Sequence, residues 1–212
     1  MTLLPRPSVP DQRRITRLMQ VALLCIVGYG IVFARPKAIV NGSVALCITV
    51  LPAVLERNYE LPLDPWLGLW ITTAVLLHTL GSAGLYGQIR WWDHLTHAAS
   101  ASLVAGVGYT AARAVELHSD DIHIPTRFAF VYLLVVVLAV GVVWELFEFG
   151  LDLLSGATGV QMPLAQHGLD DTIRDLIFNA LGALIVATFG QAHLLDVAEL
   201  VRDRLMERRA GG

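Results

Sequence analysis

The chain has 212 residues, of which 55% are hydrophobic and only 16% are charged, and its mean hydropathy is +0.61. Because soluble domains carry roughly 25% charged residues, this composition excludes an ordinary soluble domain and indicates a polytopic membrane protein. The net charge is -3, and the basic residues lie near the chain ends and in short loops, which excludes a continuous nucleic-acid surface. We therefore expect membrane lipids as partners, no nucleic acid, and a surface compatible with an oligomer.

Residues 1–17 are predicted to form a flexible basic cytoplasmic tail, because they combine three prolines with four arginines. The first apolar run follows this tail and ends at Arg35-Pro36-Lys37, which is not the small-residue pattern of a signal-peptide cleavage site. Cys25 and Cys47 each lie within an apolar run without a second nearby cysteine, so we expect two small buried hydrophobic residues there.

Six apolar runs make up residues 18–195 and predict a transmembrane domain. They cover about 18–34, 38–55, 66–86, 94–115, 128–154 and 173–195. Most are close to the ~20 residues that a helix needs to cross ~30 Å of hydrocarbon. The sequence therefore predicts an all-α integral membrane bundle of about six transmembrane helices. Residues 196–212 follow as an amphipathic cytoplasmic C-terminal segment, with apolar residues at helical spacing among charged ones.

The distribution of lysine and arginine predicts the orientation. Most of the 15 basic residues fall in the two terminal segments and in the loops that an even number of spans places on the same side. Since short cytoplasmic flanks carry an excess of lysine and arginine, we expect both termini in the cytoplasm and the protein in the plasma membrane.

The fourth run opens with Asp93-His94-Leu95-Thr96-His97 at the predicted outer end of its helix. At about 100° per residue, one helix face can present Asp93, His94 and His97 together. The same helix carries Ala98, Ser102 and Gly106 at intervals of four, and such small residues let a neighbouring helix approach closely. This helix is therefore expected to be central to the bundle.

Two further helices bring acidic stripes to the same membrane face. Glu145, Glu148 and Asp152 are spaced i, i+3, i+7 at the outer end of the fifth run. Asp171 and Asp175, with Asn179, are spaced i, i+4, i+8 at the start of the sixth run. Because polar groups at membrane depth are costly, three converging stripes indicate a functional site. Three other residues remain open as members: His78, Asp170 and His167.

Six carboxylates meet only two obvious cations there, Arg90 and Arg174. Like charges in a poorly hydrated site cannot all stay ionised unaided, so protons or a metal ion must neutralise them. Imidazole and carboxylate ligands together are typical of a divalent Zn, Fe or Mn site with one ion or a dinuclear pair. The sequence therefore predicts a metal site drawn from eight residues: Asp93, His94, His97, Glu145, Glu148, Asp152, Asp171 and Asp175.

A structural explanation of the same residues stays open. Asp93 and either Asp170 or Asp171 could be the N-cap residues of their helices, where aspartate is preferred. Glu145 and Glu148 could instead form interhelical ion pairs with arginine. A third acidic patch, around His118 and His123, is expected to be a solvated turn and not a second metal site.

The order of these motifs resembles the YjdF-like family of uncharacterised polytopic integral membrane proteins. The segments that carry the resemblance are Asp93-His94-x-x-His97, Trp144-Glu145-Leu146-Phe147-Glu148 and Asp170-Asp171-Thr172-Ile173-Arg174-Asp175, followed by Asn179-Ala180-Leu181-Gly182-Ala183. The resemblance covers about residues 66–190. It implies a shared membrane fold and a shared polar site, with Asp93, His97, Glu145, Glu148, Asp171 and Asp175 at the family's motif positions, and it implies no particular reaction.

Three functional classes remain from the sequence. A metal-dependent enzyme would use the site on a lipid-like substrate, as a hydrolase or an oxidoreductase. A cation- or proton-coupled transporter would need polar groups continuing toward the other face, whereas 130–140 and 181–187 contain no Asp, Glu, His, Lys or Arg. A non-catalytic membrane protein would use the polar residues only as interhelical pairs. One-sided placement of the polar residues favours the enzyme or a static metal site.

Overall fold

The computed structural model describes residues 7–59, 64–119, 121–159 and 168–190. Every regular element within these residues is helical, and six long helices correspond to the six predicted runs. The all-α class is therefore confirmed. Four helical stretches are long and apolar enough to cross a membrane, namely Val9–Val32, Pro36–Asn58, Pro65–Gln88 and Arg127–Thr158. The other two long helices are not among the four, so the count of six spans stays a prediction.

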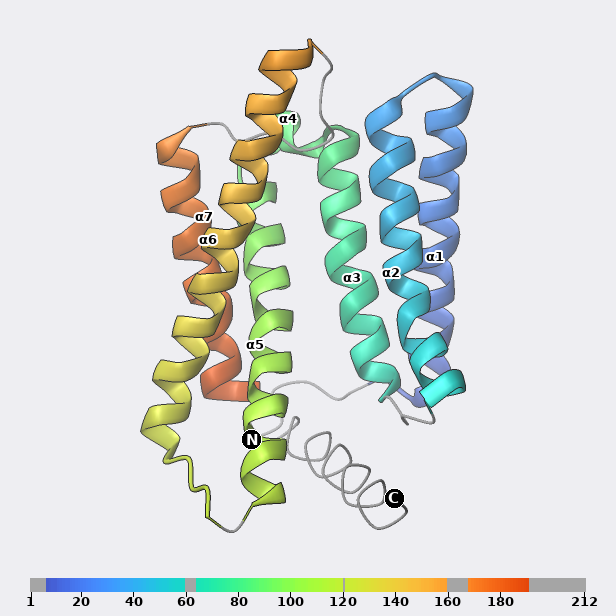
Figure 1. Ribbon diagram of the computed structural model, residues 1–212. Helices are drawn as coiled ribbons and strands as arrows, with labels where there is room; N and C mark the ends of the chain where they lie inside the picture. The colour runs from blue at the N-terminus through green and yellow to red at the C-terminus, as the bar shows by residue number, and fades with distance from the viewer. Residues whose placement is uncertain (1–6, 60–63, 120, 160–167, 191–212) are drawn as a thin grey trace. The chain divides into compact units, whose positions relative to one another are not determined.

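The chain divides into two compact units, residues 1–85 and 86–212. In the first unit, three long helices pack against one another: α1 (Val9–Val32), α2 (Pro36–Tyr59) and α3 (Pro65–Leu80), which continues into a π-helical turn, η1 (Gly81–Leu85) (Figure 1). The second unit contains the short α4 (Tyr86–Gln88) and then α5 (Trp92–His118), α6 (Thr126–Thr158), α7 (Leu169–Ile185) and η2 (Val186–Gly190). Its three long helices also contact one another.

The first helix begins earlier than the sequence predicts. Ser8 is its N-cap and accepts a hydrogen bond from the Asp11 N–H, and Pro10 stands in the first turn, where its missing N–H leaves no bond unmade. The prediction of a flexible tail through residue 17 is therefore wrong from Val9 onward. The predicted amphipathic segment 196–212 lies outside the described residues.

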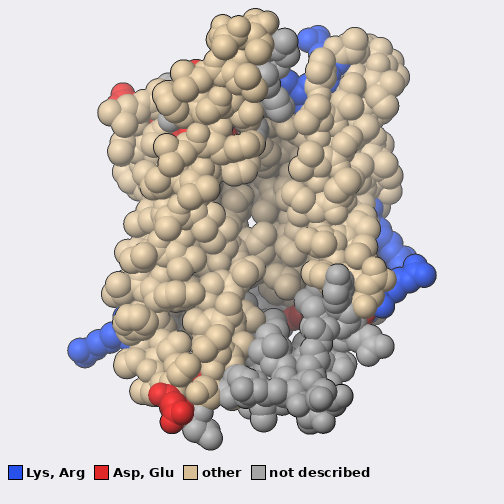
Figure 2. Space-filling view, viewed as in Figure 1, with Lys and Arg blue, Asp and Glu red and all other residues tan. Residues whose placement is uncertain are grey.

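The helix surfaces match a hydrocarbon environment. Charged side chains visible in Figure 2 lie toward the ends of the helices, and the middle of this face carries none. Cys25 and Cys47 are free and lie on exposed faces of α1 and α2, so the prediction that they are buried is wrong. In a membrane helix an exposed apolar face contacts lipid, which is an equally suitable place for a small weakly polar thiol.

Close packing of α5 against α7 positions the site. A Cβ atom at Gly182 of α7 would lie only 2.4 Å from the Ala98 carbonyl oxygen and 3.0 Å from the Ser102 N of α5. This close approach confirms that the small-residue stripe of α5 accommodates a neighbouring helix. In Figure 1 the start of α5, the later turns of α6 and the start of α7 lie at the same end of the second unit, as the alternating chain direction requires.

Candidate metal centre

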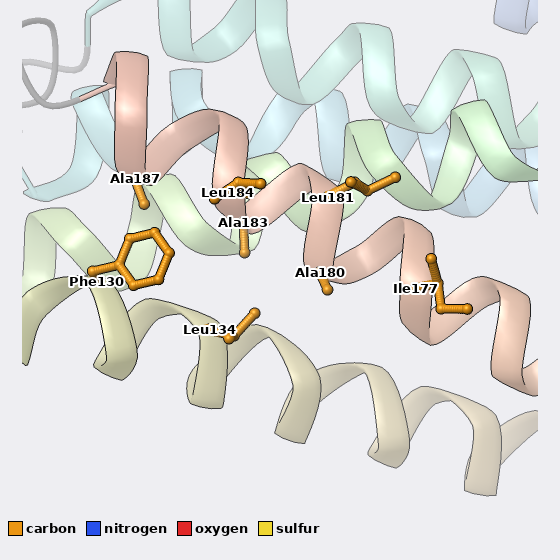
Figure 3. Close-up of a pocket in the computed structure, with 8 residues that line it drawn as sticks. All are labelled: Phe130, Leu134, Ile177, Ala180, Leu181, Ala183, Leu184 and Ala187. Carbon is orange, nitrogen blue, oxygen red and sulfur yellow. The ribbon is translucent and has the colours of Figure 1, made fainter.

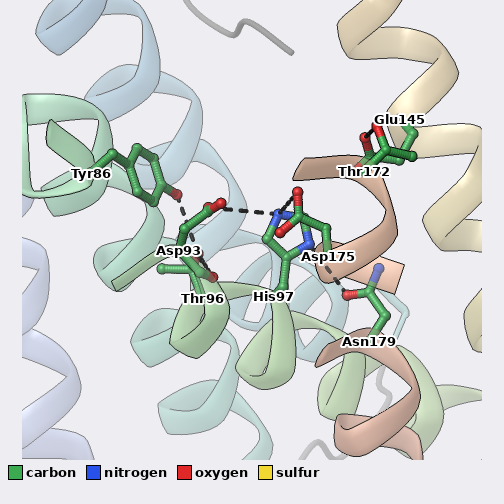
Figure 4. Close-up of polar contacts among 8 residues, drawn as sticks. All are labelled: Tyr86, Asp93, Thr96, His97, Glu145, Thr172, Asp175 and Asn179. Atoms are coloured by element: carbon green, nitrogen blue, oxygen red, sulfur yellow. Dashed lines mark hydrogen bonds and ion pairs between the residues drawn. The ribbon is translucent and has the colours of Figure 1, made fainter. Parts of the chain in front are cut away.

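Three ligand atoms converge between the first turns of α5 and α7. His97 Nε2 lies 3.7 Å from Asp93 Oδ1 and 3.6 Å from Asp175 Oδ2 (Figure 4). The three side chains form a group whose ligand atoms all lie within 4.8 Å of one another. Asp175 is buried, whereas Asp93 and His97 keep partial exposure. The geometry therefore brings together one imidazole and two carboxylates from two helices.

Asp93 reaches this group because it lies one residue inside its helix. The N-cap of α5 is Trp91, which makes no side-chain capping bond, and the N-cap of α7 is Gly168. Asp93, Asp170 and Asp171 therefore occupy first turns, where a negative charge interacts favourably with the helix dipole. The alternative that aspartate caps these two helices is wrong for all three residues.

The second nitrogen of His97 is held by α7. His97 Nδ1 lies 3.3 Å from the Asn179 side-chain oxygen, one turn beyond Asp175 (Figure 4). An amide oxygen only accepts hydrogen bonds, so Nδ1 carries the proton and Nε2 presents a lone pair in the neutral imidazole. Gly141 of α6 makes room for Asn179, because a Cβ there would lie 2.7 Å from the amide nitrogen. Asn179 thus orients the imidazole toward the two carboxylates.

Glu145 comes from α6 and lies beside the same turns of α7. Its Oε2 accepts a 2.8 Å hydrogen bond from the Thr172 hydroxyl, and the side chain is buried. Its other oxygen, Oε1, is buried without a hydrogen-bond partner among the described residues, as is Asp175 Oδ1. Neither arginine that the sequence offered as a partner, Arg90 or Arg174, forms an ion pair with Glu145 among the described residues.

Residues 15–196 match a family described as "Predicted membrane protein (DUF2238)". The chain belongs to this family. The resemblance to YjdF-like membrane proteins is therefore confirmed. The chain is also similar to an uncharacterized protein of Thermotoga maritima, with 27% identity over 171 residues that cover 78% of this chain and 84% of that protein. No solved structure matches.

In this DUF2238 protein, the remaining carboxylates divide into two kinds. The charge of Asp175 interacts with those of Asp171 and Glu148 as well as with Asp93 and Glu145. Asp152 is exposed near the end of α6, a helix that extends past the start of α7 in Figure 1. Of the six predicted carboxylates, Asp93 and Asp175 belong to the three-residue group among the described residues, and the other four lie outside it.

His94 takes a different direction from His97. Its ring stacks on Phe178 of α7, with centroids 4.2 Å apart and planes inclined by 6°. It is not part of the described three-residue group. Both histidines of α5 therefore contact α7, but differently. His94 stacks on the Phe178 ring, and His97 lies beside the Asp175 carboxylate.

Two hydroxyl groups, for which the sequence predicted no role in the site, form a chain of hydrogen bonds that ends at the Asp93 backbone. Thr96 Oγ1 donates a 2.7 Å hydrogen bond to the Asp93 carbonyl oxygen, and Tyr86 OH lies 3.3 Å from the same Oγ1. Because the threonine proton is used by the carbonyl, the tyrosine hydroxyl is the donor to Thr96. Thr96 belongs to the motif Asp93–His97 at the start of the fourth run. Tyr86 precedes that run, and the turn before α5 places its hydroxyl beside Thr96.

Among the other residues left open by the sequence, His78 lies in the last turn of α3, in the first unit, and Asp170 is exposed. His167 lies outside the described residues. Near the far end of α5, Glu116 accepts hydrogen bonds from Arg113 and from the Ile124 N–H, and lies 3.1 Å from His123. Burial opposes ionisation of Glu116, but these hydrogen bonds outweigh it and hold its pKa below the usual value. This contact fastens the turn before α6.

Proposed function

We propose that the chain binds one divalent transition-metal or zinc ion through Asp93, His97 and Asp175, and uses it in an enzymatic reaction on a lipid-like substrate. The supporting observation is that three possible ligand atoms face one another: His97 Nε2 and two carboxylate oxygens, 3.6 and 3.7 Å from it. In the neutral imidazole with Nδ1 protonated, all three atoms are acceptors. Acceptors repel at this range unless a positive charge lies between them.

The two distances from His97 Nε2 are longer than direct hydrogen bonds and close to the separation of two ligand atoms on one ion. Protein N–H···O hydrogen bonds are about 2.7–3.2 Å long, shorter than either His97–carboxylate distance. Ligand atoms about 2.0–2.2 Å from a tetrahedral ion are about 3.3–3.6 Å apart. The imidazole nitrogen favours Zn, Fe or Mn over a hard ion such as Mg²⁺.

Three protein ligands leave at least one coordination position for water or substrate, which is the pattern of catalytic rather than structural sites. A bound metal supplies an activated water or a Lewis acid there. Asn179 holds the imidazole, and Asp93 with Asp175 provides charge that balances the ion. Both a hydrolase and an oxidoreductase remain within this proposal.

A lipid-like substrate is supported by the apolar surroundings. A cavity of about 310 Å³ lies between α6 and α7, and Figure 3 shows its apolar lining. It is lined by eight residues: Phe130, Leu134, Ile177, Ala180, Leu181, Ala183, Leu184 and Ala187. Six of these residues, all except Ile177 and Ala180, fall in 130–140 and 181–187, the apolar inner halves where a transporter would need polar groups. The enzyme hypothesis is therefore preferred to cation or proton transport.

The test compares the two histidines of α5. Protein purified in detergent without chelator is expected to retain about one equivalent of metal by elemental analysis. His97→Ala should remove it, whereas His94→Ala, a matched loss of one imidazole three residues away, should not. Wild-type protein with only a small fraction of an equivalent, or equal retention in His97→Ala, would contradict the metal site.

The enzymatic part has a separate test. Metal-loaded protein incubated with a lipid extract should change the mass of at least one lipid, and His97→Ala protein should not. If both proteins leave every lipid unchanged while the metal content follows the prediction above, the metal site stands and the lipid reaction is wrong.

A further inference from the structure

The buried carboxylate oxygens between α6 and α7 are not used by the three-ligand centre. Asp175 presents Oδ2 to His97, and its Oδ1 is buried without a partner among the described residues. Glu145 likewise uses only Oε2, for Thr172, and its Oε1 is buried without a partner. Asp175 is 2% exposed and Glu145 is 5% exposed, so water does not replace the missing bonds freely.

Thr172 links the Glu145 carboxylate of α6 to α7, the helix that carries Asp175. The hydrogen bond from Thr172 fixes the Glu145 carboxylate against the start of α7, as Figure 4 shows. Residues three apart are neighbours on a helix surface, so Asp175 lies next to the threonine that holds Glu145. Glu148 follows Glu145 by three residues on α6, so the two glutamates are neighbours on the surface of that helix.

One divalent ion does not offset every buried carboxylate in this region. An ion at the first centre offsets the two charges of Asp93 and Asp175, and leaves Glu145 and Glu148. No lysine or arginine is ion-paired with Glu145 or Asp175 among the described residues. Carboxylates gathered at low dielectric need protons or a further cation to offset them.

We propose a second divalent-cation position between α6 and α7, bridged to the first centre by Asp175. Asp175 Oδ2 faces His97. The second position would be held by the two buried oxygens without a partner among the described residues, Asp175 Oδ1 and Glu145 Oε1, and by the Glu148 carboxylate. Since these ligands are all carboxylate oxygens, the position takes an oxygen-preferring cation such as Mn²⁺, Fe²⁺ or Mg²⁺. Carboxylate-bridged ions about 3.5–4 Å apart stabilise attacking and leaving oxygens together. This inference rests on the proposed function.

The position is completed when the cation binds. Glu145 and Glu148 lie outside the group of ligand atoms within 4.8 Å. Among the described residues no hydrogen bond holds Glu145 Oε1, so this oxygen can turn toward an ion without breaking a contact of its own.

The test counts bound Mn²⁺. Chelator-stripped wild-type protein in detergent, titrated with Mn²⁺, is expected to bind two equivalents, and Glu145→Gln and Glu148→Gln one each. Asp152→Asn, which removes an exposed carboxylate of the same helix, should still bind two. Elution volume and helical circular dichroism establish that each variant is folded.

The outcomes separate the two hypotheses. Wild-type saturation at one equivalent, or two equivalents retained in both glutamine variants, overturns the second position and leaves the first centre intact. No binding in wild-type protein overturns the proposed function itself. Electron paramagnetic resonance provides a readout that does not depend on variants: an exchange-coupled Mn²⁺ pair supports the bridge, and two isolated ions overturn it.

Discussion

His97 has an environment that fixes both of its ring nitrogens. Nδ1 is held by Asn179, and Nε2 faces Asp93 and Asp175. A second hydrogen bond of this kind sets the tautomer and the ring direction of a metal-binding histidine, and its loss typically lowers metal affinity 10–100-fold. In the proposed centre, Asn179 therefore acts on the metal through His97.

Replacing Asn179 tests this role. Asn179→Leu, of similar size, should lower the affinity for Zn²⁺ about 10–100-fold in a competition titration with a chelator. Asn179→Asp supplies a carboxylate acceptor to the same nitrogen and should retain most of the affinity. Equal affinities in wild-type and Asn179→Leu protein would show that the amide does not orient His97.

The spacing of residues along the sequence predicted that two of the three converging side chains, Asp93 and His97, lie together. Asp93 and His97 are four apart, so any helix places them together. Spacing could not separate His94 from His97, because the choice depends on Phe178, a residue of another helix that happens to stack on His94. Spacing also grouped Asp152 with Glu145, but the end of α6 extends past the start of α7 and leaves Asp152 exposed.

At the scale of helices, the contact between α5 and α7 determines whether the ligands can meet. Asp93 and His97 belong to one helix and Asp175 to the other, and Gly182 permits the close approach below them. From the sequence we predicted that small residues of α5, such as Ala98 and Ser102, let a neighbouring helix approach closely. The sequence did not predict that a glycine of α7 contacts them, since small residues alone do not identify their partner helix.

Gly182→Ala should separate these helices. The added Cβ would lie 2.4 Å from the Ala98 carbonyl oxygen, and overpacking of this kind typically costs about 1–3 kcal/mol. We expect a lower thermal unfolding midpoint in detergent together with weaker metal binding. Gly156→Ala is the matched control, because nothing lies within 4 Å of a Cβ there. An unchanged midpoint in Gly182→Ala would contradict the tight contact.

At the scale of the whole molecule, composition predicted the all-α membrane class, because 55% hydrophobic residues leave too few polar groups for a soluble surface. Composition did not reveal the two units, because apolar runs of similar length occur in both. It also placed the start of the first helix too late, since the prolines near Ser8 suit a helix start as well as a tail.

Orientation remains a prediction and is tested by labelling. In a background with Cys25→Ala and Cys47→Ala, Trp91→Cys should react with a membrane-impermeant maleimide on intact cells. Asp121→Cys, in the connection between α5 and α6, should react only after permeabilisation. The reverse pattern would place the polar site on the cytoplasmic face.

The most direct measurement of the central claim is X-ray absorption at the edge of the metal that copurifies with the protein. We predict a first shell of nitrogen and oxygen ligands at about 2.0–2.2 Å, with one imidazole whose scattering persists in His94→Ala protein. A first shell containing sulfur, a shell without imidazole, or the loss of imidazole scattering in His94→Ala protein would contradict a centre built on Asp93, His97 and Asp175.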